Sequence, residues 1–180
     1  MQILAVCVPQ ELVEQRLRIL AMAGVMPQTM DVEPLALLSA VLSMQEVATD
    51  ETLVLLSLAP EAALICVYHA AAGAPLIRYL QSQQQSTAEM IAEIRTAVAY
   101  FQSELAAESA LRLVYCGPES AFVELQEELQ GLLALWNYRD NPTLFDPLAM
   151  LEGAKRLLPA GTSIEGSQFA QAVGLAMRAL

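Results

Sequence analysis

Three closely spaced apolar segments decide the fold: TLVLLSL (52–58), AALICVYHA (62–70) and PLIRYLQ (75–81). They are filled with Val, Ile, Leu and aromatic residues, a composition that is typical of β-strands. Only Ala59-Pro60-Glu61 separates the first two segments, and only residues 71–74 separate the second and third. Connections this short join antiparallel neighbours, so the sequence predicts a three-stranded antiparallel meander.

Helices and strands alternate after the meander. Apolar residues at three- and four-residue steps predict a helix over about 87–107, with Thr87 as a plain N-cap and no capping box. LRLVYC (111–116) predicts the next strand, and a helix to about residue 133 follows it. The remaining predicted elements are a short strand at WNYR (136–139), a helix within 147–157 and a closing helix from about 167.

The segment before the meander has its own pattern. Residues 3–8 (ILAVCV) are continuously apolar and end at Pro9, which predicts a strand buried on both faces. A helix over 10–23, a short strand at about 28–32 and a helix from Pro34 are expected next. We therefore expect a βαβα segment in residues 1–50, followed by a second unit in residues 51–180.

Composition and charge exclude several classes of function. The formal net charge is −11 with only nine Lys and Arg residues, which disfavours binding to nucleic acid or to an anionic membrane surface. No apolar run approaches the roughly 20 residues of a membrane span. The N-terminal MQILAVCVP lacks the basic region of a signal peptide, so we expect a cytoplasmic protein.

The cysteines and the single histidine argue against a metal centre. Cys7, Cys66 and Cys116 form no CxxC pair, and each lies in a predicted strand, so we expect buried thiols. A zinc site needs about four ligands at characteristic spacing, and the chain has one histidine, His69. We expect His69 to lie at the surface or in a hairpin, without a catalytic role.

Four segments carry a family resemblance: DVEPLALLSAV (31–41), IRYLQSQ (77–83), AEIRTAVAYFQSEL (92–105) and FAQAVGLAMRAL (169–180). In this order they resemble segments of the PilM-like proteins of type IV pilus assembly, within the actin-like ATPase superfamily. The resemblance implies an α/β fold in which residues 51–180 form a ribonuclease-H-like unit and residues 1–50 are the tail of a first unit. Gly174, inside the closing helix, is expected where another backbone packs closely.

The resemblance also implies where a nucleotide would lie, at a hairpin of the form D-[IL]-G-x-x-x-T between the first two meander strands. Ser57 stands in place of its aspartate and Ala59 in place of its glycine. Pro60 removes an N–H donor, and Glu61 adds negative charge where phosphates would lie. We therefore expect weak or absent binding of ATP with magnesium.

Two further positions belong to the same implied site. Gly117, in Cys116-Gly117-Pro118-Glu119-Ser120, matches part of the adenosine-side loop, and Glu33 matches a residue that helps to organise metal-bound water in the family. We expect Ser57, Ala59, Glu33 and Gly117 to be non-functional relics, with no catalytic residue, cofactor or metal. Asp31 and Glu33 flank Val32 at a predicted strand end; they are either site carboxylates or groups that cap and solvate a helix.

The function implied by the resemblance is a non-catalytic cytoplasmic scaffold of a type IV pilus or related pseudopilus secretion machine. Its partner would be the tail of an inner-membrane PilN-like protein, and a homodimer is left open. The alternative is a fragment of an actin-like ATPase that binds and hydrolyses ATP when complete. A nuclease is disfavoured because TLVLLSL and LRLVYC carry no acidic residue for binding metal ions.

Overall fold

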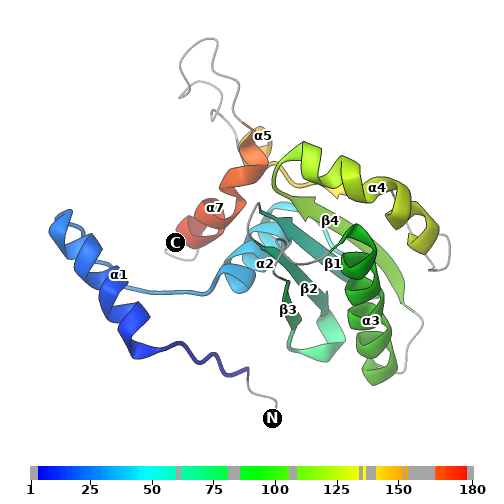
Figure 1. Cartoon of the computed structure of the whole chain (residues 1–180), viewed down its shortest axis with the longest axis horizontal. Helices are drawn as coiled ribbons and strands as arrows, with labels where there is room; N and C mark the ends of the chain where they lie inside the picture. The colour runs from blue at the N-terminus through cyan, green and yellow to red at the C-terminus, as the bar shows by residue number, and fades with distance from the viewer. Residues whose placement is uncertain are drawn as a thin grey trace.

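The protein is described by a computed structural model (Figure 1). The structure describes residues 4–59, 62–80, 86–105, 109–133, 136, 141–151, 153 and 165–177.

A mixed five-stranded sheet forms the centre of the fold, in the order β3-β2-β1-β4-β5. β1 pairs antiparallel with β2 and parallel with β4, β2 pairs antiparallel with β3, and β4 pairs parallel with β5. This arrangement confirms the predicted meander and the α/β class. The strands are β1 (Glu51–Leu58), β2 (Ala63–His69), β3 (Leu76–Leu80), β4 (Ala110–Cys116) and β5 (Thr143–Leu144).

Helices cover both faces of the sheet (Figure 1). On one face lie α3 (Thr87–Leu105) and α4 (Glu119–Leu133), and on the other lie α2 (Glu33–Met44) and α7 (Ala170–Met177). Side chains of a strand point alternately to opposite faces, so Val54 and Leu56 of β1 pack with the first pair of helices and Leu53 and Leu55 with the second. All eight residues of β1 are buried because it lies between two strands and two helical layers.

The segment before the sheet differs from the prediction. Residues 4–9 and 23–32 contain no strand, so the expected βαβα segment reduces to α1 (Gln10–Met22) and α2. A strand needs a hydrogen-bonded neighbour, and the structure places none beside residues 4–8. Cys7 is consequently exposed rather than buried, whereas Cys66 and Cys116 are buried as expected.

The smaller expectations have different outcomes. The fifth strand is Thr143–Leu144; the expected strand at WNYR falls mostly on residues 137–139, which lie outside the described residues. The short helix α5 is Pro147–Met150, and the closing helix is preceded by the 3-10 turn η3 (Gly166–Phe169). The N-cap of α3 is Ser86 rather than Thr87. Ser86 and Glu89 form a capping box: the Glu89 amide donates to Ser86 Oγ (3.3 Å) and the Ser86 amide to Glu89 Oε2 (2.7 Å).

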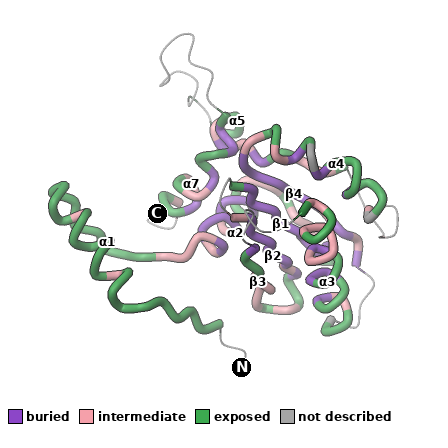
Figure 2. Tube along the Cα trace, viewed as in Figure 1, coloured by how far each residue is buried: buried purple, intermediate pink, exposed green. Residues whose placement is uncertain are grey.

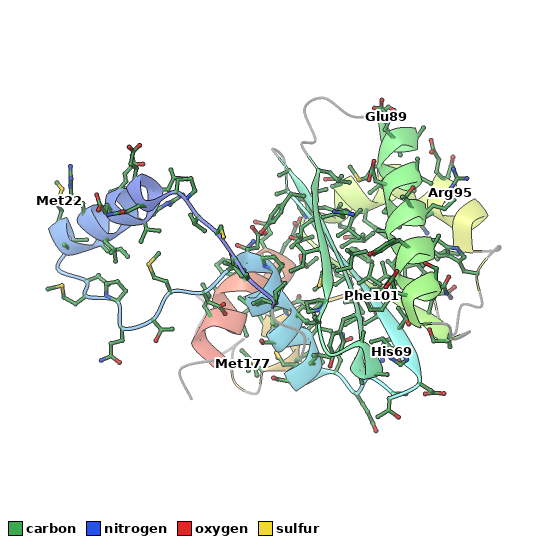
Figure 3. The ribbon with its side chains drawn as sticks, turned by 90° about the horizontal axis from the view of Figure 1, so that it is seen from below. Met22, His69, Glu89, Arg95, Phe101 and Met177 are labelled. Atoms are coloured by element: carbon green, nitrogen blue, oxygen red, sulfur yellow. The ribbon has the colours of Figure 1, made fainter. Side chains whose placement is uncertain are left out.

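His69 has a structural role at the end of β2 (Figure 3). Its side chain is buried, and Nδ1 accepts a hydrogen bond of 3.0 Å from the Ala71 amide at the start of the 3-10 turn η1 (Ala70–Ala72). The turn ends at Gly73, whose φ of 72° lies in the left-handed region. His69 therefore shapes the β2–β3 hairpin, as its position in the sequence suggested.

Candidate functional site

A pocket of about 340 Å³ lies where β1 and β4 end, on the side of the sheet covered by α2 and α7. Open α/β sheets commonly bind ligands beyond the carboxyl ends of their parallel strands, and this pocket is at the small end of the range for ligand sites. Its lining brings together four parts of the chain: Leu37; Ser57, Leu58 and Ala59; Cys116, Gly117 and Pro118; and Ser167, Gln168, Ala170 and Gln171.

The structure thus places three of the four predicted relic positions around one pocket. Ser57 lies in β1 one residue before its end, Ala59 follows the strand directly, and Gly117 follows β4. Ser57 and Cys116 are paired across the parallel β1–β4 ladder, which fixes these two loops beside one another. Pro60 and Glu61 lie outside the described residues.

The Ala59 amide already has a partner inside the turn. It donates a hydrogen bond of 3.0 Å to the Ala62 carbonyl, which closes the β1–β2 hairpin. A phosphate cradle requires backbone N–H groups that are free to point at the ligand. The Ala59 N–H does not meet that requirement in this conformation.

Gly117 allows the ends of β1 and β4 to approach closely. Its φ is 120°, and a Cβ at this position would overlap the backbone carbonyl oxygen of Leu58. Its own carbonyl accepts a hydrogen bond of 2.8 Å from the buried Ser167 hydroxyl, which ties the loop after β4 to η3. The conformation of this loop is therefore fixed by steric fit and by a partner distant in sequence.

The pocket floor contains a thiol that is not poised for reaction. Burial raises the pKa of Cys116 to about 11, against a partial lowering by a hydrogen bond with Ser57. The Cys116 thiol also lies 3.6 Å from the Leu56 carbonyl oxygen, to which it can donate. Because the thiolate is the nucleophile, a thiol kept protonated in this way is a packing group.

Glu33 is linked to the pocket by a hydrogen bond with Gln171. Burial raises the pKa of the Glu33 carboxyl, and a hydrogen bond with Gln171, which lines the pocket, partly opposes that rise. Its neighbour Asp31 accepts a hydrogen bond of 2.8 Å from the Val32 amide through Oδ1. Glu33 is the first residue of α2 and Val32 its N-cap, so both carboxylates lie at the positive end of this helix.

The described lining has no charged side chain, and apolar atoms make up most of its surface. None of the described lining residues is Lys, Arg or His, and the groups available are hydroxyls, side-chain amides, a thiol and backbone atoms. Within the described part of the chain, no group of three or more His, Cys, Asp or Glu residues is placed to hold a metal ion. The arrangement favours neutral hydrogen-bonding groups over a polyphosphate, which needs cations or several free N–H donors.

The closing segment supplies pocket residues that the sequence did not single out. Ser167, Gln168 and Gln171 line the pocket from η3 and α7, more than 100 positions after Ser57. They follow no motif of their own, and only the folding of α7 against α2 brings them to the site. The nearest signal in the sequence is the resemblance of FAQAVGLAMRAL to a family closing helix, which begins just after the first two of them.

Comparison with solved structures gives a substantial match over most of the chain. Of the solved structures, a chain of the PilM–PilN type IV pilus biogenesis complex superposes with a TM-score of 0.70 at 22% sequence identity, over 94% of this chain and 58% of that one. This chain has that fold. The family resemblance inferred from the four segments is in agreement with it, and the present chain spans 58% of the pilus protein's length.

Other comparisons add little. A Bacteroides thetaiotaomicron protein with an actin-like ATPase fold and unknown function matches at 16% identity with a TM-score of 0.41, over 68% of this chain and 41% of that one. No family model and no curated protein sequence matches the chain. In the described residues, no helix is both long and apolar enough to cross a membrane.

Proposed function

We propose that this chain is a non-catalytic interaction protein of a type IV pilus or a related pseudopilus secretion machine. It acts by contact, in the cytoplasm and at the periphery of the inner membrane, where a membrane partner holds it. The proposal is supported by the fold shared with the pilus biogenesis complex, in which PilM and PilN associate. A cytoplasmic tail of a PilN-like protein is the partner that we propose for this chain.

The proposal that the chain is not a catalyst rests on the chemistry of the pocket at the ends of β1 and β4. Ser57 offers a hydroxyl where a metal-binding nucleotide site needs a carboxylate, and the Ala59 N–H is used within its own turn. The described lining has no cation to meet a phosphate. The Glu33 carboxyl nearby would repel an unneutralised triphosphate.

Thermal unfolding with nucleotide tests the non-catalytic part. A ligand that binds the folded state at a hundredfold excess over its Kd stabilises that state by about 2.7 kcal/mol. We expect no shift in Tm with ATP and magnesium beyond the shift that ATP with EDTA or inorganic pyrophosphate causes. A large magnesium-dependent stabilisation by ATP would refute this part and favour the alternative, a fragment of an actin-like ATPase.

A binding experiment tests the partner. The cytoplasmic tail of the PilN-like protein from the same organism, made as a labelled peptide, should bind the purified chain in a fluorescence anisotropy titration. A peptide of the same composition in scrambled order is the control. Equal binding of both peptides, or of neither, would contradict the proposed partner.

A further inference from the structure

The hydroxyl and thiol groups that line the pocket donate their protons to atoms of the protein itself. The Ser167 hydroxyl donates to the Gly117 carbonyl oxygen at 2.8 Å. The Cys116 thiol can donate to the Leu56 carbonyl oxygen, and the Ser57 hydroxyl bonds to the sulfur of Cys116, which is a weak acceptor. Ser57 and Ser167 are only 8% and 4% exposed. Their oxygen lone pairs are therefore available to a ligand in the pocket but scarcely to bulk water.

The two glutamines of the lining show the same pattern. Gln168 Nε2 donates to Glu165 Oε2 at 2.8 Å. Gln171 bonds to the Glu33 carboxyl, and this bond acts to lower the pKa of Glu33, as an N–H donor to a carboxylate does. Each amide keeps one N–H and its carbonyl oxygen. The side chains of the lining thus offer more free acceptors than free donors, which suits a ligand that brings N–H groups of its own.

The charge beside the pocket is negative. Glu33 and Glu165 each bond to a lining glutamine, and neither has an ion pair with a described residue. Burial raises the pKa of Glu33, and no described cation offsets that rise. A ligand with a positive charge and N–H donors would find free acceptors and an opposite charge together, the combination that gives the stronger hydrogen bonds.

The rest of the lining suits an alkyl chain. Its apolar side chains come from all the segments around the pocket: Leu37, Leu58, Ala59, Pro118 and Ala170. Lysine and arginine bury their methylene stems against such surfaces while the charged head reaches polar groups. A volume of about 340 Å³ suits one side chain better than a large ligand. β1 and the middle of α2, which carry part of the lining, are buried, so the floor of the pocket is held in place (Figure 2).

We propose that this pocket binds a basic side chain of a protein partner, a lysine or arginine whose stem lies against the apolar wall and whose cationic head meets the acceptor oxygens beside Glu33. The inference rests on the proposed function for the nature of the partner. Cytoplasmic segments next to the membrane spans of membrane proteins are enriched in Lys and Arg. A chain with a net charge of −11 attracts such a segment, so the charges of the two proteins are complementary.

The first experiment uses small probes and does not depend on the identity of the partner. Acetyl-arginine amide and acetyl-lysine amide are titrated into the isotope-labelled chain and followed by NMR. Acetyl-citrulline amide is the control, because it has the shape of the arginine probe without its charge. We expect saturable shifts of the backbone amide signals of Ala59, Gly117 and Gln171, which line the pocket. The citrulline probe should bind about tenfold more weakly, because charge-assisted hydrogen bonds are the stronger ones.

Two variants tie this binding to the pocket. Glu33→Gln removes the carboxylate but keeps a partner for Gln171, and it should weaken the arginine probe by about tenfold. Glu127→Gln is the matched control, because it changes the net charge equally at an exposed position of α4 outside the lining, and it should leave binding unchanged. Ala59→Phe, at an exposed position of the lining, should obstruct the pocket and weaken both basic probes.

The second experiment tests whether the PilN-like tail supplies the side chain. Each Lys or Arg of the labelled tail peptide is replaced in turn by Gln, and its affinity for the wild-type chain and for Glu33→Gln is measured by fluorescence anisotropy. We expect one position at which replacement weakens binding to the wild type by about tenfold and binding to Glu33→Gln much less. Such non-additivity is the mark of two groups in contact.

The proposed function and this inference fail separately. If the tail binds and none of its basic positions couples to Glu33, the inference is overturned and the proposed partner stands. If the arginine probe binds in the pocket and the tail does not bind, the proposed partner is wrong and the preference of the pocket for a basic side chain stands. Equal binding of the arginine and citrulline probes, or no shift at the pocket signals, would overturn the inference. Tighter binding of putrescine than of the arginine probe would also overturn it, since the pocket would then be a site for free amines.

Discussion

The backbone of Gly174 in α7 lies directly against the backbone of Ala36 in α2. A Cβ at Gly174 would overlap the Ala36 carbonyl oxygen, so the two helices approach as closely as helix backbones can. Both residues are buried, and this contact holds α7 over the end of the sheet where it lines the pocket. The expectation that Gly174 marks a close approach of two backbones is confirmed.

Gly174→Ala should therefore destabilise the fold. Alanine is favoured over glycine in a helix by up to about 1 kcal/mol, but overpacking against backbone costs about 1–3 kcal/mol, so the steric cost should win. Gly131→Ala in α4 is the matched control, because a Cβ there meets nothing within 4 Å. In urea denaturation, Gly131→Ala should gain stability and Gly174→Ala should lose it; equal gains would contradict the close approach.

Glu33→Gln should stabilise the protein at neutral pH. Burial raises the pKa of Glu33 above its ordinary 4.5, so the folded state holds the proton more tightly than the unfolded chain. The contribution of Glu33 to the free energy of unfolding is therefore largest below pH 4.5, and it decreases as the pH rises through the pKa of the folded state. Glutamine does not ionise, so the variant avoids this loss of stability, and its side chain can still hydrogen-bond to Gln171. The gain in stability is limited because the positive end of α2 favours the charged form of Glu33 in the wild type.

The measurement is Tm of Glu33→Gln against wild type at neutral pH and below pH 4.5. The difference in favour of the variant should be larger at neutral pH. Glu127→Gln, at an exposed position of α4, is the control and should show no such pH dependence. A difference for Glu33→Gln that does not change with pH would show that its carboxyl is not desolvated as the structure indicates.

Thiol reactivity should separate the three cysteines. Burial raises the pKa of Cys66 to about 12 and is the main cause of the raised pKa of Cys116, whereas Cys7 is exposed. We expect one fast-reacting thiol with a maleimide in the native protein and three after denaturation. Mass spectrometry of the labelled peptides should find the fast label on Cys7. Rapid labelling of Cys66 or Cys116 in the native protein would contradict their burial in the core.

The start of α3 offers a test of the capping box. Ser86→Ala should cost about 0.5–2 kcal/mol, because it removes the acceptor of the Glu89 amide at the first turn. Thr87→Ala should cost less, although Thr87 is the N-cap that the sequence alone suggests. Chemical denaturation of both variants decides between the two positions, and a larger loss for Thr87→Ala would contradict the box.

The sequence by itself determined the elements whose signals are local or closely spaced. The apolar periodicity of α3 and the short turns between 52–58, 62–70 and 75–81 were sufficient for the helix and the meander, because helices and hairpins form from neighbours in the chain. The site was partly predictable as well. Ser57, Ala59 and Gly117 could be placed at strand ends from their order, and the ends of parallel strands meet.

Tertiary structure decided what depends on partners distant in sequence. Residues 3–8 have strand composition, yet residues 4–8 form no strand, since pairing needs an edge that local composition cannot supply. Thr143–Leu144 forms the fifth strand because it pairs in parallel with the end of β4. The packing of α7 on α2 brought Gln171 to Glu33. The sequence predicted a close backbone approach at Gly174, but only the tertiary structure shows that its partner is Ala36, because the two residues are distant in the chain.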